Sequence, residues 1–555
     1  MKTKRTLLFA LLAATITWPV LNAQTTSPDP TVSNKDKKKS TLDDEAIVLS
    51  PFEVSTTKDT GYQATETLAG TRIRSDLKDI GASISVITKD FMNDIGATNA
   101  GSLLQYTTNA EVAGTLGTYT GLGNGTTLDE SANLRSPQGA QRIRGLAAAD
   151  NTRDYFVTDI PWDGYNVDRI DILRGPNSFL FGLGSPAGIV NATIQGADFR
   201  NTAKVETRIG SYGSLRNSVS INQELIHNVL AIRVAGLADD QRYEQKQAYQ
   251  DQRRGYVALR FDPKLFKNSS ANTSIKVKAE NGSISADRPR SVAPYDSLTP
   301  WWTSMNKYAL ANPYVAGSNP RGVNPWIAAV PGNVQQPLWL IDGGGNQLFQ
   351  IYGGQVNTGA LNASGVPVLN GDLVGKLYDF EYFGLTNASS YAVNAGLPNA
   401  GNYRGQTLRD SSVFDFYDNL IDGPTKSEWE HWNTFNVDLS QTFLDDRIGI
   451  DLVYDHQKYR NGSQSLLGGS PTLSIDLLQN QGDLSTNPNF GRPYVLGGPG
   501  SGGTTQTERK DYRASIFGEL RPKDFIKSDL LLSLIGKQRL NGVASQDKYY
   551  NQSRS

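Results

Sequence analysis

Two arginines at the ends of predicted strands are the side chains best placed for ion-pair chemistry. Arg144 closes the short stretch Gln141–Ile143, and Arg174 follows the alternating stretch Asp168–Leu173. The Gly-Pro after Arg174 ends that strand, because proline fixes its own φ and biases the preceding residue toward extended geometry. Taken singly, each arginine is explained equally well as a solvated turn residue; together they indicate fixed pairing positions. The set comprises Arg144, Gly145, Arg174, Gly175 and Pro176.

Patterns for bond-making chemistry do not stand out. The chain has no cysteine and three histidines, His227, His431 and His456, and none of them belongs to an HExxH pair, so no metal site is expected. His431 and His456 lie on predicted neighbouring strands and could meet, although ordinary barrel histidines explain them more simply. The Gly-rich stretch Gly182–Gly188 lacks the Lys-Ser/Thr of a phosphate-binding loop, and no G-x-S-x-G elbow is present. Carboxylates are plentiful, but no glycosidase-like pair stands out. We expect neither an enzyme nor a cofactor.

The N-terminus and the composition narrow the class of protein. Basic residues before the apolar run Leu7–Val20 predict a secretory signal peptide over residues 1–23. No later run reaches the ~18 apolar residues of a transmembrane helix. Without the three basic residues of the signal, 51 basic face 55 acidic residues, a net charge of −4 that does not indicate a nucleic-acid partner. The composition suits a secreted β-rich protein or an outer-membrane barrel, in which only alternate strand residues face lipid.

Alternating segments dominate the chain after Phe199. In one of them Val257, Leu259 and Phe261 alternate with Arg260, which suits a wall that is apolar on one side and wet on the other. We count nine such segments: five before residue 281, two between residues 430 and 460, and two after residue 509, the last around Leu530–Leu534. A soluble sandwich would show the same alternation.

Two long loops are expected, over about residues 281–430 and 461–508. A long insertion on a regular scaffold usually carries function. The first loop holds tryptophans that could stack on a ligand or could form the loop's own small core. These ligand-contact candidates are Trp301, Trp302, Trp326 and Trp339.

The segment between Ile143 and Asn191 resembles the plug domain of TonB-dependent outer-membrane transporters. The resemblance rests on the order of IRG, DRIDILRGP and G-x-G-S-P-A-G-I-V-N. It implies a mainly β fold, with a small α/β plug domain at residues 61–199 and a transmembrane antiparallel β-barrel from residue 200 to 555, incomplete in this chain. It also implies that Arg144 and Arg174 pair with barrel carboxylates and lock the plug in place.

A short β-prone island interrupts the polar tail of residues 24–60. Residues 24–44 have the composition of a disordered segment, and an edge-competent strand there is a liability unless it pairs with something. The island resembles the TonB box, the peptide that recruits a TonB-type energy-coupling protein by strand addition; it could instead be the first strand of the plug. The box comprises Glu45, Ala46, Ile47, Val48, Leu49 and Ser50.

The resemblance implies a receptor of the Gram-negative outer membrane. It would contact membrane lipid, bind a scarce ligand outside the cell and admit it by energy-coupled plug rearrangement. The ligand class stays open among siderophore, cobalamin, oligosaccharide and peptide. A secreted carbohydrate-binding or carbohydrate-active protein and a passive porin are the alternatives. Nine strands are an odd count, and plugged transporters of this kind use ~22, so we expect an N-terminal fragment.

Overall fold

The computed structural model describes most of the chain after residue 50. The described residues are 51–54, 59, 61–70, 72–113, 138–175, 184–266, 270–290, 293–296, 407–467, 471–475, 488, 492–496, 501–520 and 538–555, together with four short strands between residues 338 and 370. The chain divides into residues 1–48 and 49–555, and the first unit lies outside the described part. Within the described part, no helix has the length and apolar character needed to cross a membrane.

A five-stranded sheet forms the centre of the predicted plug. Its order is β3-β8-β9-β6-β7, antiparallel except for the parallel pair β6 and β9. The strand β8 was expected to be half-buried, but it is buried on both faces, because Asp171 is only 2% exposed and accepts a hydrogen bond from the Tyr155 hydroxyl. Gly188 turns the chain into β9 at φ 115°, where a Cβ would lie 1.9 Å from the Leu173 carbonyl oxygen. The strands are β3 (Ser83–Ile87), β6 (Asp150–Arg153), β7 (Phe156–Val157), β8 (Val167–Arg174) and β9 (Gly188–Ile194).

The sequence predicts a helix start at Thr88–Met92 and a short helix at Asn99–Tyr106, and a helix forms at each place. The helix α1 (Lys89–Asp94) begins after Thr88, whose hydroxyl accepts from the Phe91 amide. The helix α2 (Ala100–Leu104) begins after Asn99, which forms a capping box with Ser102. The sequence also predicts short strands at Thr71–Arg74 and Ile160–Pro161; Thr71 lies outside the described residues, and the others are not in strands. The small strands are instead β1 (Glu66–Thr67), β2 (Ser75–Asp76), β4 (Ala110–Val112) and β5 (Gln141–Ile143).

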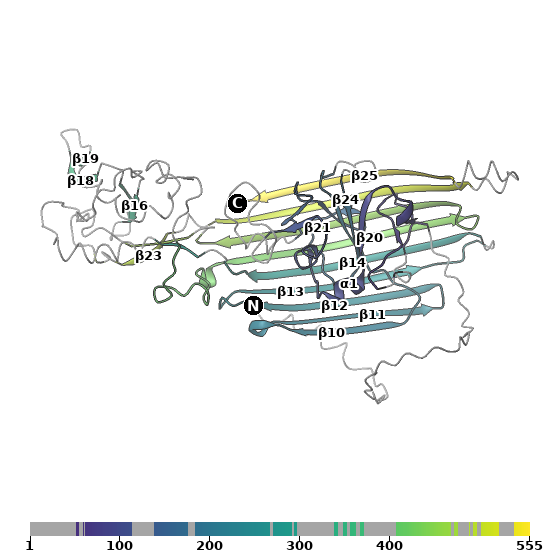
Figure 1. Ribbon diagram of the computed structural model, residues 1–555, viewed down its shortest axis with the longest axis horizontal. Helices are drawn as coiled ribbons and strands as arrows, with labels where there is room; N and C mark the ends of the chain where they lie inside the picture. Colours follow the sequence, from purple (N-terminus) through teal and green to yellow (C-terminus); the bar gives the residue numbers. More distant parts are fainter. Residues whose placement is uncertain are drawn as a thin grey trace, which may run out of the picture. The chain divides into compact units, whose positions relative to one another are not determined.

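Nine long antiparallel strands form the second sheet (Figure 1). Their order is β10-β11-β12-β13-β14-β20-β21-β24-β25, which confirms the predicted count. The described pairings leave β10 and β25 at the edges of this sheet. The predicted segment around Leu530–Leu534 lies outside the described residues, and the ninth described strand, β25, begins at Gln538. The bounds are β10 (Thr202–Ile209), β11 (Leu215–Ile226), β12 (Leu230–Arg242), β13 (Tyr249–Phe261), β14 (Asn272–Asp287), β20 (Ser427–Phe443), β21 (Ile448–Ser465), β24 (Ser501–Leu520) and β25 (Gln538–Arg554).

Several strands run further than the hydrophobic alternation predicts, so the expected loop bounds are wrong. β14 continues to Asp287 and β20 begins at Ser427, although the first loop was expected over residues 281–430. The reason is that ladder hydrogen bonds need only backbone groups, and the polar ends of these strands keep their pairing. Further strands lie in the two long connections: β15 (Tyr295–Asp296), β16 (Leu338–Ile341), β17 (Leu348–Ile351), β18 (Val356–Leu361), β19 (Pro367–Asn370), β22 (Thr472–Ile475) and β23 (Pro493–Leu496).

The two faces of the nine-stranded sheet differ as the alternation predicts. On β13, Val257, Leu259 and Phe261 are exposed on the outer face, while Arg254 and Arg260 are buried on the inner face. The inner face packs against the plug through a shared apolar cluster. Small side chains on β12 and β13 let the plug approach this wall closely: Ala231, Ala235 and Ala258.

Candidate functional site

A buried carboxylate on the inner wall holds the plug. Glu280 on β14 has a fully buried side chain, and its Oε2 lies 2.6 Å from an Nη of Arg153 on plug strand β6. Arg254 on β13 lies 3.4 Å from Oε1. The Asn166 amide donates to Oε2 at 3.0 Å and the Trp432 indole donates to Oε1 at 3.3 Å. We call these five residues the Glu280 cluster. Both guanidinium groups are themselves nearly inaccessible, so their charges depend on this one carboxylate.

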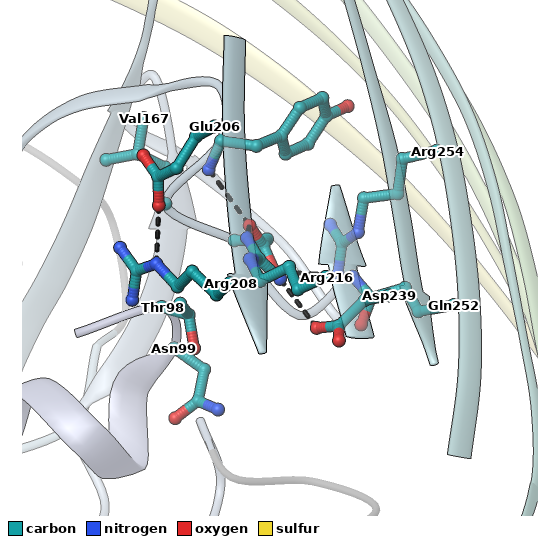
Figure 2. Close-up of polar contacts among 12 residues, drawn as sticks. Thr98, Asn99, Val167, Glu206, Arg208, Arg216, Asp239, Gln252 and Arg254 are labelled. Atoms are coloured by element: carbon teal, nitrogen blue, oxygen red, sulfur yellow. Dashed lines mark hydrogen bonds and ion pairs between the residues drawn. The ribbon is translucent and has the colours of Figure 1, made fainter. Parts of the chain in front are cut away.

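A second cluster joins plug and wall nearer the turn between β10 and β11. Arg216 on β11 donates to both carboxylate oxygens of the plug residue Asp163, one of them at 3.1 Å, and to Asp239 on β12 at 2.6 Å. Figure 2 shows Arg216 reaching toward Asp239 from the neighbouring strand. Burial alone would raise the pKa of Asp163, but Arg216 and Arg254 outweigh it and lower that pKa below its usual value. We call Asp163, Arg216 and Asp239 the Asp163 cluster.

The Asp163 cluster borders a cavity of about 850 Å³ between plug and wall. This volume falls within the usual range for small-molecule sites, which is roughly 300–1,000 Å³. The wall contributes long polar side chains and the plug contributes the start of α2 and an aromatic ring, several of which are drawn in Figure 2. Residues of the cavity include Thr98, Asn99, Trp162, Arg208, Tyr212, Tyr243, Gln252, Arg254, Arg290 and Phe416.

A third contact fixes the described residues nearest to the predicted TonB box. Glu53 lies 2.8 Å from Lys276 and 3.3 Å from Arg260, both on the inner wall. Burial would raise the pKa of Glu53, but Lys276 and Arg260 outweigh it and lower that pKa to about 2. The neighbouring Phe52 ring packs edge-on against Phe517 on β24 at 6.4 Å. The segment after the box is therefore held by both charge and packing.

The connection after β7 carries further plug–wall contacts. The Thr158 hydroxyl donates to Gln457 on β21 at 2.6 Å, and Asp159 lies 3.0 Å from Arg509 on β24. The sequence prediction missed these residues and both clusters. The sequence feature that could have indicated these contacts is the density of acidic and aromatic side chains in the short connection after β7.

The predicted lock residues lie together within the plug. Arg174 is half-buried and donates to the Ser85 hydroxyl and the Thr108 carbonyl, each at 2.7 Å. Arg144 is exposed at φ 58°, and one of its guanidinium nitrogens lies 3.4 Å from where a Cβ on Gly175 would stand. Gly145 is left-handed at φ 68°. Within the described residues neither arginine has a carboxylate at ion-pair distance, and their pairing with barrel carboxylates stays a prediction. Pro176 lies outside the described residues.

The other predicted site residues are described only in part. The box residues Glu45–Ser50 and the tryptophans Trp301, Trp302 and Trp326 lie outside the described residues, and Trp339 is described only as part of β16. The two histidines do not pair across strands, because His431 faces Arg460 and His456 faces Phe435. Among the described residues, no group of three or more acidic or histidine side chains is arranged to hold a metal ion.

Comparison with known proteins agrees with this geometry. Residues 76–189 match the family described as TonB-dependent Receptor Plug Domain. The chain is 26% identical over 223 residues to the ferrioxamine receptor of Yersinia enterocolitica, covering 40% of this chain and 29% of that protein. It is 26% identical over 165 residues to the metal-pseudopaline receptor CntO of Pseudomonas aeruginosa, covering 30% and 22%. The matches therefore span less than a third of these relatives' lengths.

A solved structure supports the fold. The complex of FpvAI with pyocin S2 aligns over 90% of this chain and 45% of that chain, with a TM-score of 0.50 and 12% identity. The match to the plug family, the antiparallel sheet and the similarity to known receptors together indicate a plug-carrying receptor of the Gram-negative outer membrane. The chain therefore contains a plug domain of the TonB-dependent receptor type at residues 76–189, followed by an antiparallel sheet with nine described strands.

Proposed function

We propose that the receptor binds a small ligand in the cavity beside the Asp163 cluster and admits it by an energy-coupled movement of the plug. The observation that carries this proposal is that ion pairs between plug and wall border a cavity of ligand size. Ion pairs have two arrangements, made and broken, so a ligand that competes for Arg216 can bias the position of the plug.

The cargo that we propose is the metal complex of a small chelator. The relatives' names specify ferrioxamine and metal-pseudopaline, and the cavity offers hydrogen-bond donors and acceptors on both walls. Asn99, Arg208 and Gln252 would orient such a ligand by hydrogen bonds. Cobalamin, oligosaccharide and peptide cargoes remain the alternatives to be tested in the same assay.

The energy input would enter through the predicted box. A partner strand that pairs with Glu45–Ser50 gains a ladder of backbone hydrogen bonds, which gives a grip suited to pulling. The first described wall contacts along the pulled chain are those of Phe52 and Glu53. Force on the box therefore reaches the wall contact of Glu53 before it reaches either plug cluster.

Uptake of labelled metal chelates by cells that carry the intact receptor tests the proposal. Val48→Pro removes a backbone donor from the box and should abolish uptake while leaving ligand binding unchanged. Val32→Pro makes the same change in the polar tail outside the box and serves as the matched control. Uptake that persists in Val48→Pro would reject energy coupling through this segment, and ion conduction without energy input would favour a porin.

A further inference from the structure

A group of basic side chains lies on the outer face of β21, β24 and β25. Cross-strand pairing places His456, Lys510 and Lys548 in one row, and Lys458 beside Glu508 in the next row. Directly paired residues on neighbouring strands share a face, and these alternate with inward residues such as Gln457 that contact the plug. We call Lys458, Lys510 and Lys548 the outer lysine group.

One carboxylate contacts two of these three lysines. Glu508 Oε1 lies 2.9 Å from His456, 3.0 Å from Lys510 and 3.6 Å from Lys458. Lys548 is exposed and lies directly opposite Lys510. Like charges directly opposite each other destabilise a sheet unless an anion lies between them. The three lysines therefore exceed their acidic neighbour by two positive charges.

Beyond the lysines, toward the turn between β20 and β21, the next rows of outward side chains are aromatic and then apolar. Tyr454 and Tyr512 are paired, with ring centroids 5.0 Å apart, and Leu452 and Ile516 on the following rows are 46% and 60% exposed. Exposed aliphatic rows bounded by tyrosines mark where a barrel wall passes from the hydrocarbon region to the lipid headgroups. The lysines lie immediately beyond that boundary, and their aliphatic stems can follow the apolar surface while the ammonium groups reach the headgroups.

The rows of lysines lie toward the outer rim. The turn between β20 and β21 spans only residues 444–447, whereas the connection from β21 to β24 spans residues 466–500. Barrels of this kind have short periplasmic turns and longer extracellular loops. The lysine group therefore lies at the level of the outer leaflet.

Another part of the outer face shows that this excess charge is local. Near the same rim, Arg253 on β13 pairs with Asp240, and Arg242 at the end of β12 pairs with Asp251. Each arginine there has its own carboxylate, so those outer positions are balanced. An excess of positive charge thus distinguishes the outer face of β21, β24 and β25 from the outer face of β12 and β13.

We propose that the outer lysine group binds the phosphate groups of a phosphorylated lipid of the outer leaflet, with the acyl chains lying along Leu452 and Ile516. The site is separate from the ligand cavity and does not depend on the proposed cargo. Phosphate fits because it can accept from two or three lysines at once and neutralises the excess charge. The site would fix how these strands sit against the lipid.

Native mass spectrometry of the intact receptor in mild detergent, titrated with lipid A, tests this site. We expect each Lys→Gln change in the outer lysine group to weaken lipid A binding by about fivefold. Arg253→Gln removes a balanced charge and should leave binding unchanged. Glu508→Gln removes the competing carboxylate and should strengthen binding, an effect opposite to that of a purely structural role.

Two further titrations separate the sources of phosphate. Lipid A should bind more tightly than its dephosphorylated form, and inorganic phosphate alone should not displace it at equal concentration. Equal binding by both lipids, displacement by free phosphate, or unchanged binding in the Lys458→Gln, Lys510→Gln, Lys548→Gln variant would overturn the proposal. The lysines are exposed, and heat-modifiable mobility on gels verifies that each variant keeps its barrel.

Discussion

The two clusters that join plug and wall differ in their access to ligand. In the Glu280 cluster, every charged side chain is nearly inaccessible, and the carboxylate has four partners. In the Asp163 cluster, Arg216 and Asp239 line the cavity and remain 11% and 23% exposed. The Glu280 carboxylate is fully buried, whereas Arg216 and Asp239 border the cavity. Arg254 connects the two regions, because it pairs with Glu280 and also lines the cavity.

On the proposed function, this difference separates contacts that hold the plug in place from contacts that respond to a bound ligand. A fully buried carboxylate cannot exchange its partners for ligand atoms, so we expect Glu280 to act on the position of the plug. Arg216 can exchange Asp163 for a ligand acceptor while Asp239 keeps its charge compensated. A receptor that must be tightly closed when empty and responsive when occupied needs both kinds of contact.

The largest effect is expected from Glu280→Gln. The change removes the buried carboxylate at ion-pair distance from Arg153 and Arg254, which should lower the free energy of unfolding by ~3–5 kcal/mol. Thermal unfolding and ion leak through the purified intact receptor in planar bilayers measure it. Glu206→Gln is the matched control, because its partners Lys204 and Arg208 are solvent-accessible and the pair should contribute under ~1 kcal/mol. Similar effects of the two changes would remove the distinction between buried and solvent-accessible contacts.

An intermediate effect is expected from Asp163→Asn. Arg216 keeps Asp239, so the loss should be ~1–2 kcal/mol, with a smaller rise in leak than in Glu280→Gln. Ligand affinity should change as well, because Arg216 is freed toward the cavity, whereas Glu280→Gln should leave affinity unchanged. Titration of both variants with the transported chelate measures this, with Asp239→Asn as the control that keeps the plug contact. Affinity that responds to Glu280 and not to Asp163 would reverse the assignment.

The most local effect is expected from protonation of Glu53. Its pKa is lowered from 4.5 to about 2 in the folded protein, so its stabilising contact is complete above pH 4.5 and is lost as the pH falls toward 2. Protease protection of residues 51–54 should therefore be constant from pH 7 to pH 4.5 and should decline below that. Glu53→Gln should abolish this pH dependence while leaving both clusters intact. A decline that begins near pH 6 would point to a different group.

The sequence predicts the wall better than the site. Alternation places Lys276, Lys278 and Glu280 together on one face of a strand, and the structure puts all three toward the plug. Alternation also predicts nine strands, but it fails where strands extend into polar sequence, because backbone pairing continues without apolar side chains. The plug helices are predictable because Thr88 and Asn99 cap them locally.

The clusters themselves could not be predicted, since they depend on how the plug is rotated against the wall. Arg153 and Glu280 are far apart in sequence, and no local pattern joins them. The two Arg-Gly elements show the opposite relation between sequence and structure. They are conspicuous in sequence, yet Arg174 donates to Ser85 and Thr108 within the plug. Short-range pattern thus locates charged faces, whereas the partners of those charges follow from tertiary geometry.

The connection after β7 sets a constraint on the order of assembly. Thr158 is bonded to a residue 299 positions later in the chain, and Asp159 to one 350 positions later. Contacts of such sequence separation form slowly, because a long loop must close before they contribute. The plug is synthesised first, yet these contacts cannot form until β21 and β24 are in place. Seating of the plug is therefore a late event in the biogenesis of the receptor, and a receptor interrupted before β21 would hold its plug by the Glu280 and Asp163 clusters without the contacts to β21 and β24.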